Sequence, residues 1–386
     1  MYTVDQPVDR QGLMASDLPV EQRTCPHLRR ATEGPTVRRV RTPAGDDAWL
    51  VAGHAEVQDL LRDDRLGRSH TAPDGRSQYA GNPTYDHVPA TDHALADAMH
   101  GMLRTLLKPH FTARRMLAMR PHVDGLVASR MDVVLADGPP ADLRTAFSEP
   151  LIRQVFCDVY GVPAAEAHEC VGYMRRVATG DFAGLAEYLP RLVAAKRAQP
   201  DDGLVSRLCA TGVSTQQVCQ VVMVLEFAGF GATRKQIDYG LLLLAEHPGE
   251  RAAVAADPAL LPAAVEELLR MSGSLSLPRY ARQDIEIAGV TIGAGDLVLL
   301  DLTRANYDGA AFDDPTTLDL ARTRNRHVTF SHGVWTCLGA PLARTILSSV
   351  FQAVLTRMPG LRPTRPVSGA SGPLSGGLPD RLEFTW

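Results

Sequence analysis

The feature that most constrains this chain is a cysteine set between two glycines near the C-terminal end of the sequence. Cys337 follows Gly333 by four residues and precedes Gly339 by two, in the pattern F-x-x-G-x-x-x-C-x-G that Phe330 opens. Glycine permits positive φ angles and a close approach of the backbone, so glycines at two fixed places predict a tight loop around the sulfur. The residues 340–347 that follow at once are a good helix opening.

Such a loop suits a cysteine thiolate that binds a metal. The N-terminal N–H groups of the following helix would favour the ionised sulfur, and Phe330 can shield it from solvent. Ligation by a thiolate makes a haem iron electron-rich and promotes O–O cleavage. A lone cysteine is more often a buried core thiol, but a core thiol needs no flanking glycine pattern. The full pattern resembles the cysteine loop of the cytochrome P450 family, and specifically its short, soluble, bacterial type.

The resemblance extends over almost the whole chain and implies a P450 fold, mainly α with small antiparallel β-sheets. It implies one large helical domain, residues 1–386, around a buried haem b, with about residues 1–15 flexible. Cys337 would ligate the iron, and Phe330, Gly333 and Gly339 would contact the haem. A prior of about 150 residues per domain alone suggests two or three domains. The chain carries a formal net charge of −4, which argues against a nucleic-acid surface.

Local patterns agree with this fold class. Alternating apolar residues near 35–52 and 284–302 predict short strands, the latter in a small antiparallel sheet. Helical periodicity dominates from about Asp97 to Met271, and one further helix is expected after the cysteine loop, to about Met358.

An acid and a base one helical turn apart form a second motif, E-x-x-R. Glu267 and Arg270 would share one helix face, where they can pair. A surface pair is the ordinary interpretation of this spacing, but here a Pro-Arg-x-Ala-Arg stretch, a β-rich segment and the cysteine loop follow in the family's order. The resemblance implies that the pair binds an arginine that precedes the cysteine loop. Arg322 is the expected partner, with Arg324 or Arg326 as alternatives.

Four basic residues fall where the family binds the haem propionates: His100, Arg104, Arg279 and His327. His100 and Arg104 lie four apart on one helix face. Buried propionates need cationic partners, because an unpaired buried charge is very costly. Trp335 departs from the family, since many relatives have His or Arg two residues before the cysteine. An indole carries no charge and donates one hydrogen bond, so one propionate should depend more on the other four residues.

A larger departure lies in the long apolar helix expected from about Thr215 to Glu246. Ala228-Gly229 matches the family's A-G-x-[DE]-T motif, but Gly231 stands at the acid position and Ala232 at the alcohol position. Neither side chain can relay a proton, and Thr233 is displaced by roughly 100° around the helix. Ordered water could replace the pair, the substrate could supply N–H or O–H groups, or the reaction could couple radicals instead of hydroxylating. A faulty alignment is the remaining alternative.

The substrate pocket is implied only by the resemblance, and about half of its expected residues could be plain core. They are mostly apolar or aromatic, as a pocket usually is: Tyr85, Val88, Phe227, Phe230, Leu275, Leu277 and Leu374.

Ser274–Arg279 and Leu382–Trp386, with the missing acid and alcohol, look similar to bacterial P450s that oxidise cyclic dipeptides. This implies radical oxidation of a tryptophan- or tyrosine-containing cyclic dipeptide, with C–C or C–N coupling. One alternative is an ordinary monooxygenase that hydroxylates or epoxidises a polyketide, terpene or fatty acid. Another is a non-catalytic haem-binding protein.

The expected partners are a small-molecule substrate, O2, and a ferredoxin with its reductase, because the chain contains no flavin or nicotinamide segment. Six cysteines without a C-x-x-C pair argue against structural zinc and fit a reduced, cytoplasmic protein. The sequence contains no apolar stretch long enough to cross a membrane. A cytoplasmic monomer that binds neither membrane nor nucleic acid is therefore expected.

Overall fold

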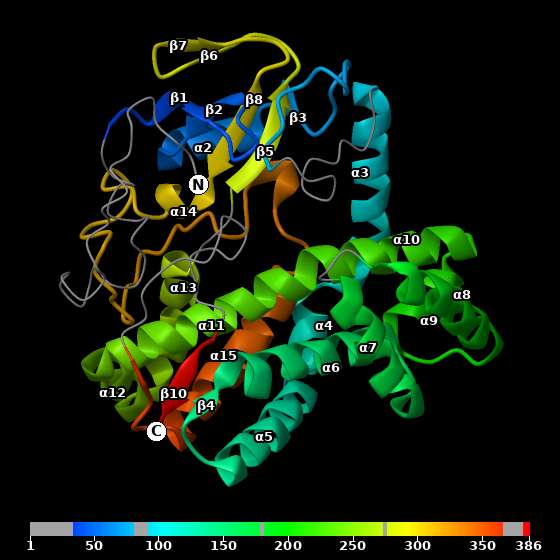
Figure 1. Ribbon diagram of the computed structural model, residues 1–386, viewed down its shortest axis with the longest axis vertical. Helices are drawn as coiled ribbons and strands as arrows, with labels where there is room; N and C mark the ends of the chain where they lie inside the picture. The colour runs from blue at the N-terminus through cyan, green and yellow to red at the C-terminus, as the bar shows by residue number, and fades with distance from the viewer. Residues whose placement is uncertain (1–33, 81–91, 178–180, 273–275, 366–380) are drawn as a thin grey trace. The chain divides into compact units, whose positions relative to one another are not determined.

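The computed structural model describes residues 34–80, 92–177, 181–272, 276–365 and 381–386 of the chain (Figure 1). The chain divides into two compact units. The first unit comprises 1–102, 239–337 and 359–381, and the second comprises 103–238, 338–358 and 382–386. That the whole chain acts as one domain stays a prediction.

A five-stranded sheet forms the centre of the first unit, in the order β1-β2-β8-β5-β3. Its strands are β1 (Val37–Arg41), β2 (Asp47–Val51), β8 (Leu297–Asp301), β5 (Ser276–Ala281) and β3 (Leu66–Gly67). All pairings are antiparallel except β2 with β8, which is parallel. Every residue of β8 is buried, as befits a strand covered on both faces. A separate antiparallel hairpin joins β6 (Ile285–Ile287) and β7 (Val290–Ile292).

Helices α2 (His54–Arg62) and α14 (Leu302–Ala305) pack on this sheet and share its apolar core. The first unit further includes α12 (Pro248–Ala256) and α13 (Leu261–Met271). Leu60 and Leu61 of α2 pack with Val298 and Leu300 of β8 in one buried cluster. The unit also contains the short strand β9 (Arg362–Pro363).

The second unit is almost entirely helical. Its helices are α4 (Ala113–Ala118), α5 (Arg120–Asp137), α6 (Glu149–Tyr160), α7 (Ala167–Val177), α8 (Ala183–Ala198), α9 (Leu204–Ala210), α10 (Thr215–Leu225) and α15 (Ala340–Arg357). Helix α5 packs against α15 and α6, as Figure 1 shows. Strands β4 (Ala141–Asp142) and β10 (Glu383–Thr385) pair antiparallel at its margin. Two helices, α3 (His93–Leu107) and α11 (Gly231–Glu246), contribute residues to both units.

The expected long helix is present as α10 and α11, joined without a break by one π turn, Glu226–Phe230. Ser214 begins it with a reciprocal capping box to Gln217. Inside the π turn, Gly229 lies against α6, where an added Cβ would fall 2.6 Å from Phe156 Cζ. Only glycine therefore lets the two helices approach this closely here.

The mainly α fold class with small, mostly antiparallel sheets is confirmed. The helix after the cysteine loop ends at Arg357, one residue from its expected end. Among the helices of the described ranges, none combines the length and the apolar character that a membrane crossing requires.

Candidate active site

The cysteine loop is a tight turn fixed by its own backbone. The Cys337 N–H donates to the Phe330 carbonyl at 2.8 Å, and the Ser331 N–H donates to the Val328 carbonyl at 2.7 Å. Gly333 has a φ of +60°, and an added Cβ there would lie 2.9 Å from the Leu61 carbonyl oxygen. Both the angle and the close approach require glycine.

Gly339 departs from the expectation of a positive φ. It has a φ of −79° and is the N-cap residue of α15, so it serves as the helix start instead. The loop thus leads directly into a helix, as expected, and only Gly333 carries the unusual backbone angle of the two glycines.

Cys337 is exposed, whereas Cys157 and Cys170 are buried. The alternative that Cys337 is a core thiol is therefore wrong. Metal ligation requires a cysteine at a surface that a ligand can reach, and Cys337 lies at one.

Trp335, two residues before the cysteine, joins two of the residues expected to bind propionate. Its indole stacks on the His100 ring at 4.3 Å between centroids, with an interplanar angle of 27°. On the same indole, Arg279 places its guanidinium carbon 4.4 Å from the ring centroid, a cation–π geometry. The structure therefore brings His100, Trp335 and Arg279 together.

Arg279 is a buried cation that lacks a counter-charge among the described residues. Its side chain donates one hydrogen bond, from Nη1 to the Pro278 carbonyl at 2.8 Å, while its buried Nε has no partner within the described ranges. Burial, and then the nearby charge of Arg68, lower the pKa of Arg279. Two neighbouring arginines without a carboxylate call for an anion, so these residues fit a haem propionate.

Sequence reasoning missed Arg68. It follows β3 in a loop rich in glycine and serine and shows no motif. Only the pairing of β3 with β5, more than 200 positions away, reveals its neighbour.

His327 differs from expectation. Its Nε2 lies 3.1 Å from Glu266 Oε2, and its Nδ1 accepts from the Thr329 N–H at 3.3 Å. Both ring nitrogens are engaged within the protein, so neither is left for the expected propionate contact. The ring still lies near Phe330, at 5.9 Å between centroids. Arg104 lies one turn after His100 on α3, as expected.

The E-x-x-R pair forms a fully buried ionic cluster. Arg270 donates to both carboxylate oxygens of Glu267, at 2.7 and 2.8 Å, and both side chains are 0% exposed. Arg322, the expected partner, places its Nε 3.2 Å from Glu267 Oε2. Asn325 Nδ2 and the Asp319 N–H donate to the same carboxylate at 3.0 and 3.1 Å. These last two contacts were not anticipated from the sequence.

The middle of the long helix shows how the missing acid and alcohol are placed. Gly231 is half-buried, Ala232 is exposed and Thr233 is buried. Because Thr233 faces the interior and Ala232 does not, Thr233 is no substitute at the alcohol position. Arg234, the next residue, pairs with Asp238 at 2.6 Å.

A buried acid lies on the turn before this motif. Glu226 is 3% exposed, and the Tyr160 hydroxyl donates to its Oε2 at 3.4 Å. Burial raises the pKa of Glu226 to about 7, while Arg153 and Tyr160 oppose that shift. Sequence reasoning missed this group, because a glutamate in an apolar helix carries no pairing signal by itself.

The two phenylalanines expected to contact substrate lie in different environments. Phe227 is 47% exposed, whereas Phe230 is buried with Arg153 4.0 Å above its ring. Both lie within the π turn Glu226–Phe230, yet only Phe230 faces the interior. Leu277 is half-buried in β5. The other expected pocket residues, Tyr85, Val88, Leu275 and Leu374, lie outside the described residues.

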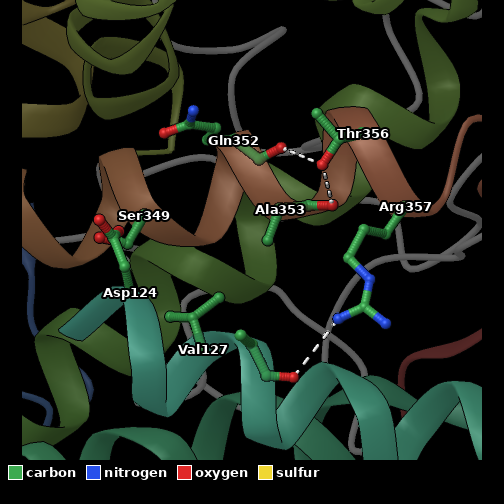
Figure 2. Close-up of a pocket in the computed structure, with 8 residues that line it drawn as sticks. Asp124, Val127, Ser349, Gln352, Ala353, Thr356 and Arg357 are labelled. Atoms are coloured by element: carbon green, nitrogen blue, oxygen red, sulfur yellow. Dashed lines mark hydrogen bonds between the residues drawn. The ribbon is translucent and has the colours of Figure 1, made fainter. Parts of the chain in front are cut away.

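A cavity of about 240 Å³ in the second unit lies between α5 and α15 (Figure 2). Its polar groups are already bonded: Thr356 donates to the Gln352 and Ala353 carbonyls, and Arg357 binds Asp132 and the Ala128 carbonyl. This groove is a packing feature and offers little to a reaction.

Known proteins resemble the chain over most of its length. The family model described as Cytochrome P450 matches residues 194–358. Pentalenolactone synthase of Streptomyces exfoliatus is 37% identical over 86% of this chain and 87% of its own. Mycinamicin IV hydroxylase/epoxidase of Micromonospora griseorubida is 34% identical over 84% and 86%.

A solved structure agrees with these relatives. The substrate-free cytochrome P450 that epoxidises the polyene macrolide antibiotic pimaricin superposes with a TM-score of 0.85 at 40% identity. The match covers 94% of this chain and 95% of that one. With the cysteine loop, the buried E-x-x-R cluster and these matches together, the chain belongs to the cytochrome P450 family.

Proposed function

We propose that this oxidoreductase is a haem-thiolate monooxygenase that oxidises a secondary metabolite, with haem b bound at Cys337. The observation that carries the proposal is an exposed cysteine in a loop whose Trp335 lies under the buried Arg279, a cation that has no counter-charge among the described residues. When bound, a thiolate-ligated haem activates molecular oxygen. Phe330, Gly333 and Gly339 would frame the sulfur, and His100, Arg104 and Arg279 would hold the propionates.

The substrate class is inferred from the relatives and from the exposed apolar side chains. The relatives are named for pentalenolactone, mycinamicin and the macrolide antibiotic pimaricin. On the long helix of this chain, Val224 and Phe227 are apolar and exposed, which suits an apolar substrate. Tyr85, Val88, Leu275, Leu277 and Leu374 stay predicted contacts.

The test is a reconstituted reaction with ferredoxin, ferredoxin reductase and a reduced nicotinamide, which together stand for the proposed electron donors. Hydroxylation or epoxidation uses O2, two electrons and two protons, leaving one oxygen atom in the product and one in water. A product heavier by one oxygen supports the proposal. Binding of haem without any turnover would instead favour a non-catalytic haem protein.

The variant Cys337→Ser tests the ligand itself. The wild-type protein should give the reduced carbon monoxide spectrum of a thiolate-ligated haem, and the variant should lose it, because a serine hydroxyl is a poor anionic ligand. Persistence of that spectrum in the variant would show that another residue ligates the iron.

A second candidate function is favoured by the lack of proton-relaying side chains at Gly231 and Ala232. Coupling of an aromatic cyclic dipeptide removes two hydrogen atoms from the substrate instead of inserting oxygen. With two electrons and two protons from the donors, both atoms of O2 then leave as water. A product lighter by two hydrogens, or a dimer, would support coupling over hydroxylation.

The remaining proposals are a single catalytic domain, a monomer, and a place in the cytoplasm where reduced ferredoxin is available. Sedimentation of the purified holoprotein at several concentrations tests the oligomeric state.

A further inference from the structure

Trp335 carries no charge at a position where the resemblance implies a cation, and the sheet of the first unit suggests where that charge is replaced. In β3 and β5, Leu66 lies opposite Ala281 and Gly67 lies opposite Tyr280. Continuing this antiparallel register by one residue sets Arg68 opposite Arg279. Arg68 is the first residue after the paired strand, so the strand pairing brings it close to Arg279.

Arg68 has no counter-charge among the described residues. Its side chain is exposed and forms no hydrogen bond or ion pair within the described ranges, although the surrounding protein atoms lower its pKa. The nearby carboxylate Asp97 is already taken, since Arg282 binds it with two hydrogen bonds of 2.7 and 2.8 Å. The charge of Arg68 acts on the buried Arg279, and because two neighbouring cations repel each other, this arrangement favours a ligand that carries negative charge.

Trp335 contacts both His100 and Arg279 and carries no charge itself. Its indole is stacked on His100 and lies under the Arg279 guanidinium. A histidine or arginine at 335 would add a third positive charge next to Arg68 and Arg279. A neutral aromatic ring instead fixes the direction of Arg279 without adding repulsion.

We propose that Arg68 supplies the cation that position 335 lacks, and that Arg68 and Arg279 together bind one haem propionate while Trp335 holds Arg279 in place. This inference rests on the proposed haem site. It makes Arg68 a binding residue and Trp335 a positioning residue. The cation would thus come from the residue after β3 instead of from the cysteine loop.

Haem release tests the assignment. In the holoprotein, transfer of haem to an excess of apomyoglobin reports its dissociation rate. Arg68→Gln should speed this transfer about tenfold or more, because it removes a charge-assisted hydrogen bond. The transfer rate of Arg68→Lys should lie between that of wild type and that of Arg68→Gln. Arg65→Gln is the matched control: Arg65 lies three residues away and binds Asp63, so haem release should stay within about twofold of wild type.

A double substitution tests the exchange of roles. In the Arg68→Gln background, Trp335→His restores a cation to the cysteine loop and should recover haem retention. In the wild-type background the same change should bring no gain, because it adds a third cation. If Trp335→His fails to recover haem retention in the Arg68→Gln background, the proposed exchange of roles is contradicted.

The apoprotein gives a readout that does not depend on haem chemistry. Arg68→Gln should raise the melting temperature of the apoprotein, since it relieves repulsion, while lowering that of the holoprotein. If wild type binds haem normally and Arg68→Gln behaves like Arg65→Gln, the role of Arg68 is refuted while the proposed function stands. Wild-type protein that takes up no haem would overturn both.

Discussion

Two groups of buried charge in the first unit differ in whether the protein supplies the counter-charge. Around Glu267, two arginines, an amide and a backbone N–H all bind one carboxylate. Around Arg279, the neighbouring charge is Arg68, which has the same sign.

The difference separates a structural role from a binding role. A carboxylate with every lone pair engaged gains nothing from a further ligand, and removing one member leaves the others uncompensated. A pair of like charges behaves in the opposite way, because the binding of an oppositely charged ligand reduces the repulsion between them. Buried charge is therefore a sign of a functional site only where the protein leaves it unneutralised.

The largest expected effect comes from the neutralised group. Glu267→Gln leaves two buried arginines without their anion and should lower the free energy of unfolding by about 3–5 kcal/mol. Urea unfolding of the purified protein measures it. Glu286→Gln, at an exposed position in β6, is the control and should change little. A loss below about 1 kcal/mol for Glu267→Gln would break the comparison.

Glu226 is an intermediate case, because its acid is buried with one long hydrogen bond. The groups that face it are Arg153 and Tyr160 of α6 and Cys170 of α7. Its pKa is raised from 4.5 to about 7, so the folded state holds the proton more tightly than the unfolded state. The stabilisation is complete below about pH 4.5 and is lost as the pH rises through 7.

Glu226→Gln should remove this pH dependence, because glutamine does not titrate. As the pH rises from 4.5 to 8, the free energy of unfolding of the variant relative to wild type should rise by up to about 3 kcal/mol. This is the free energy that corresponds to the pKa shift of Glu226. Thermal unfolding across that range measures it. If the pH dependence of thermal unfolding is the same for the two proteins, burial does not raise the pKa of Glu226.

The smallest effect is expected where the charge is left for a ligand. Arg279→Met removes a desolvated cation at similar volume and should stabilise the apoprotein by about 1 kcal/mol. The holoprotein should instead lose haem faster. Melting curves of the variant and of wild type, each with and without haem, measure the stability change in both forms. A variant that is destabilised in both forms would show that Arg279 stabilises the fold.

Local patterns predicted the parts of the site that are encoded by neighbours in the sequence. The cysteine loop, the Glu267–Arg270 spacing and the long helix all follow from residues within a few turns of each other. Contacts between distant segments were missed, as for Arg68 beside Arg279 and Glu266 beside His327. The order of strands in a sheet, and hence the neighbours of a charge, is set by tertiary packing.

Backbone irregularities were missed for a different reason. The π turn at Glu226–Phe230 leaves no compositional sign, so the sequence predicted one regular helix through this stretch. Gly339 matched a motif position but serves as an N-cap. A motif specifies the type of residue at a position, but its backbone φ angle depends on the local structure around it.

The π turn has a further consequence for how the length of this helix can change. A turn closed by i→i+5 bonds holds one residue more than an α turn. Losing a single residue between Glu226 and Phe230 would convert it to an ordinary turn while the flanking helices keep their orientation. The same loss in α11 would rotate everything beyond it by about 100°. Single-residue gaps among homologues should therefore gather at this turn and spare the rest of the helix.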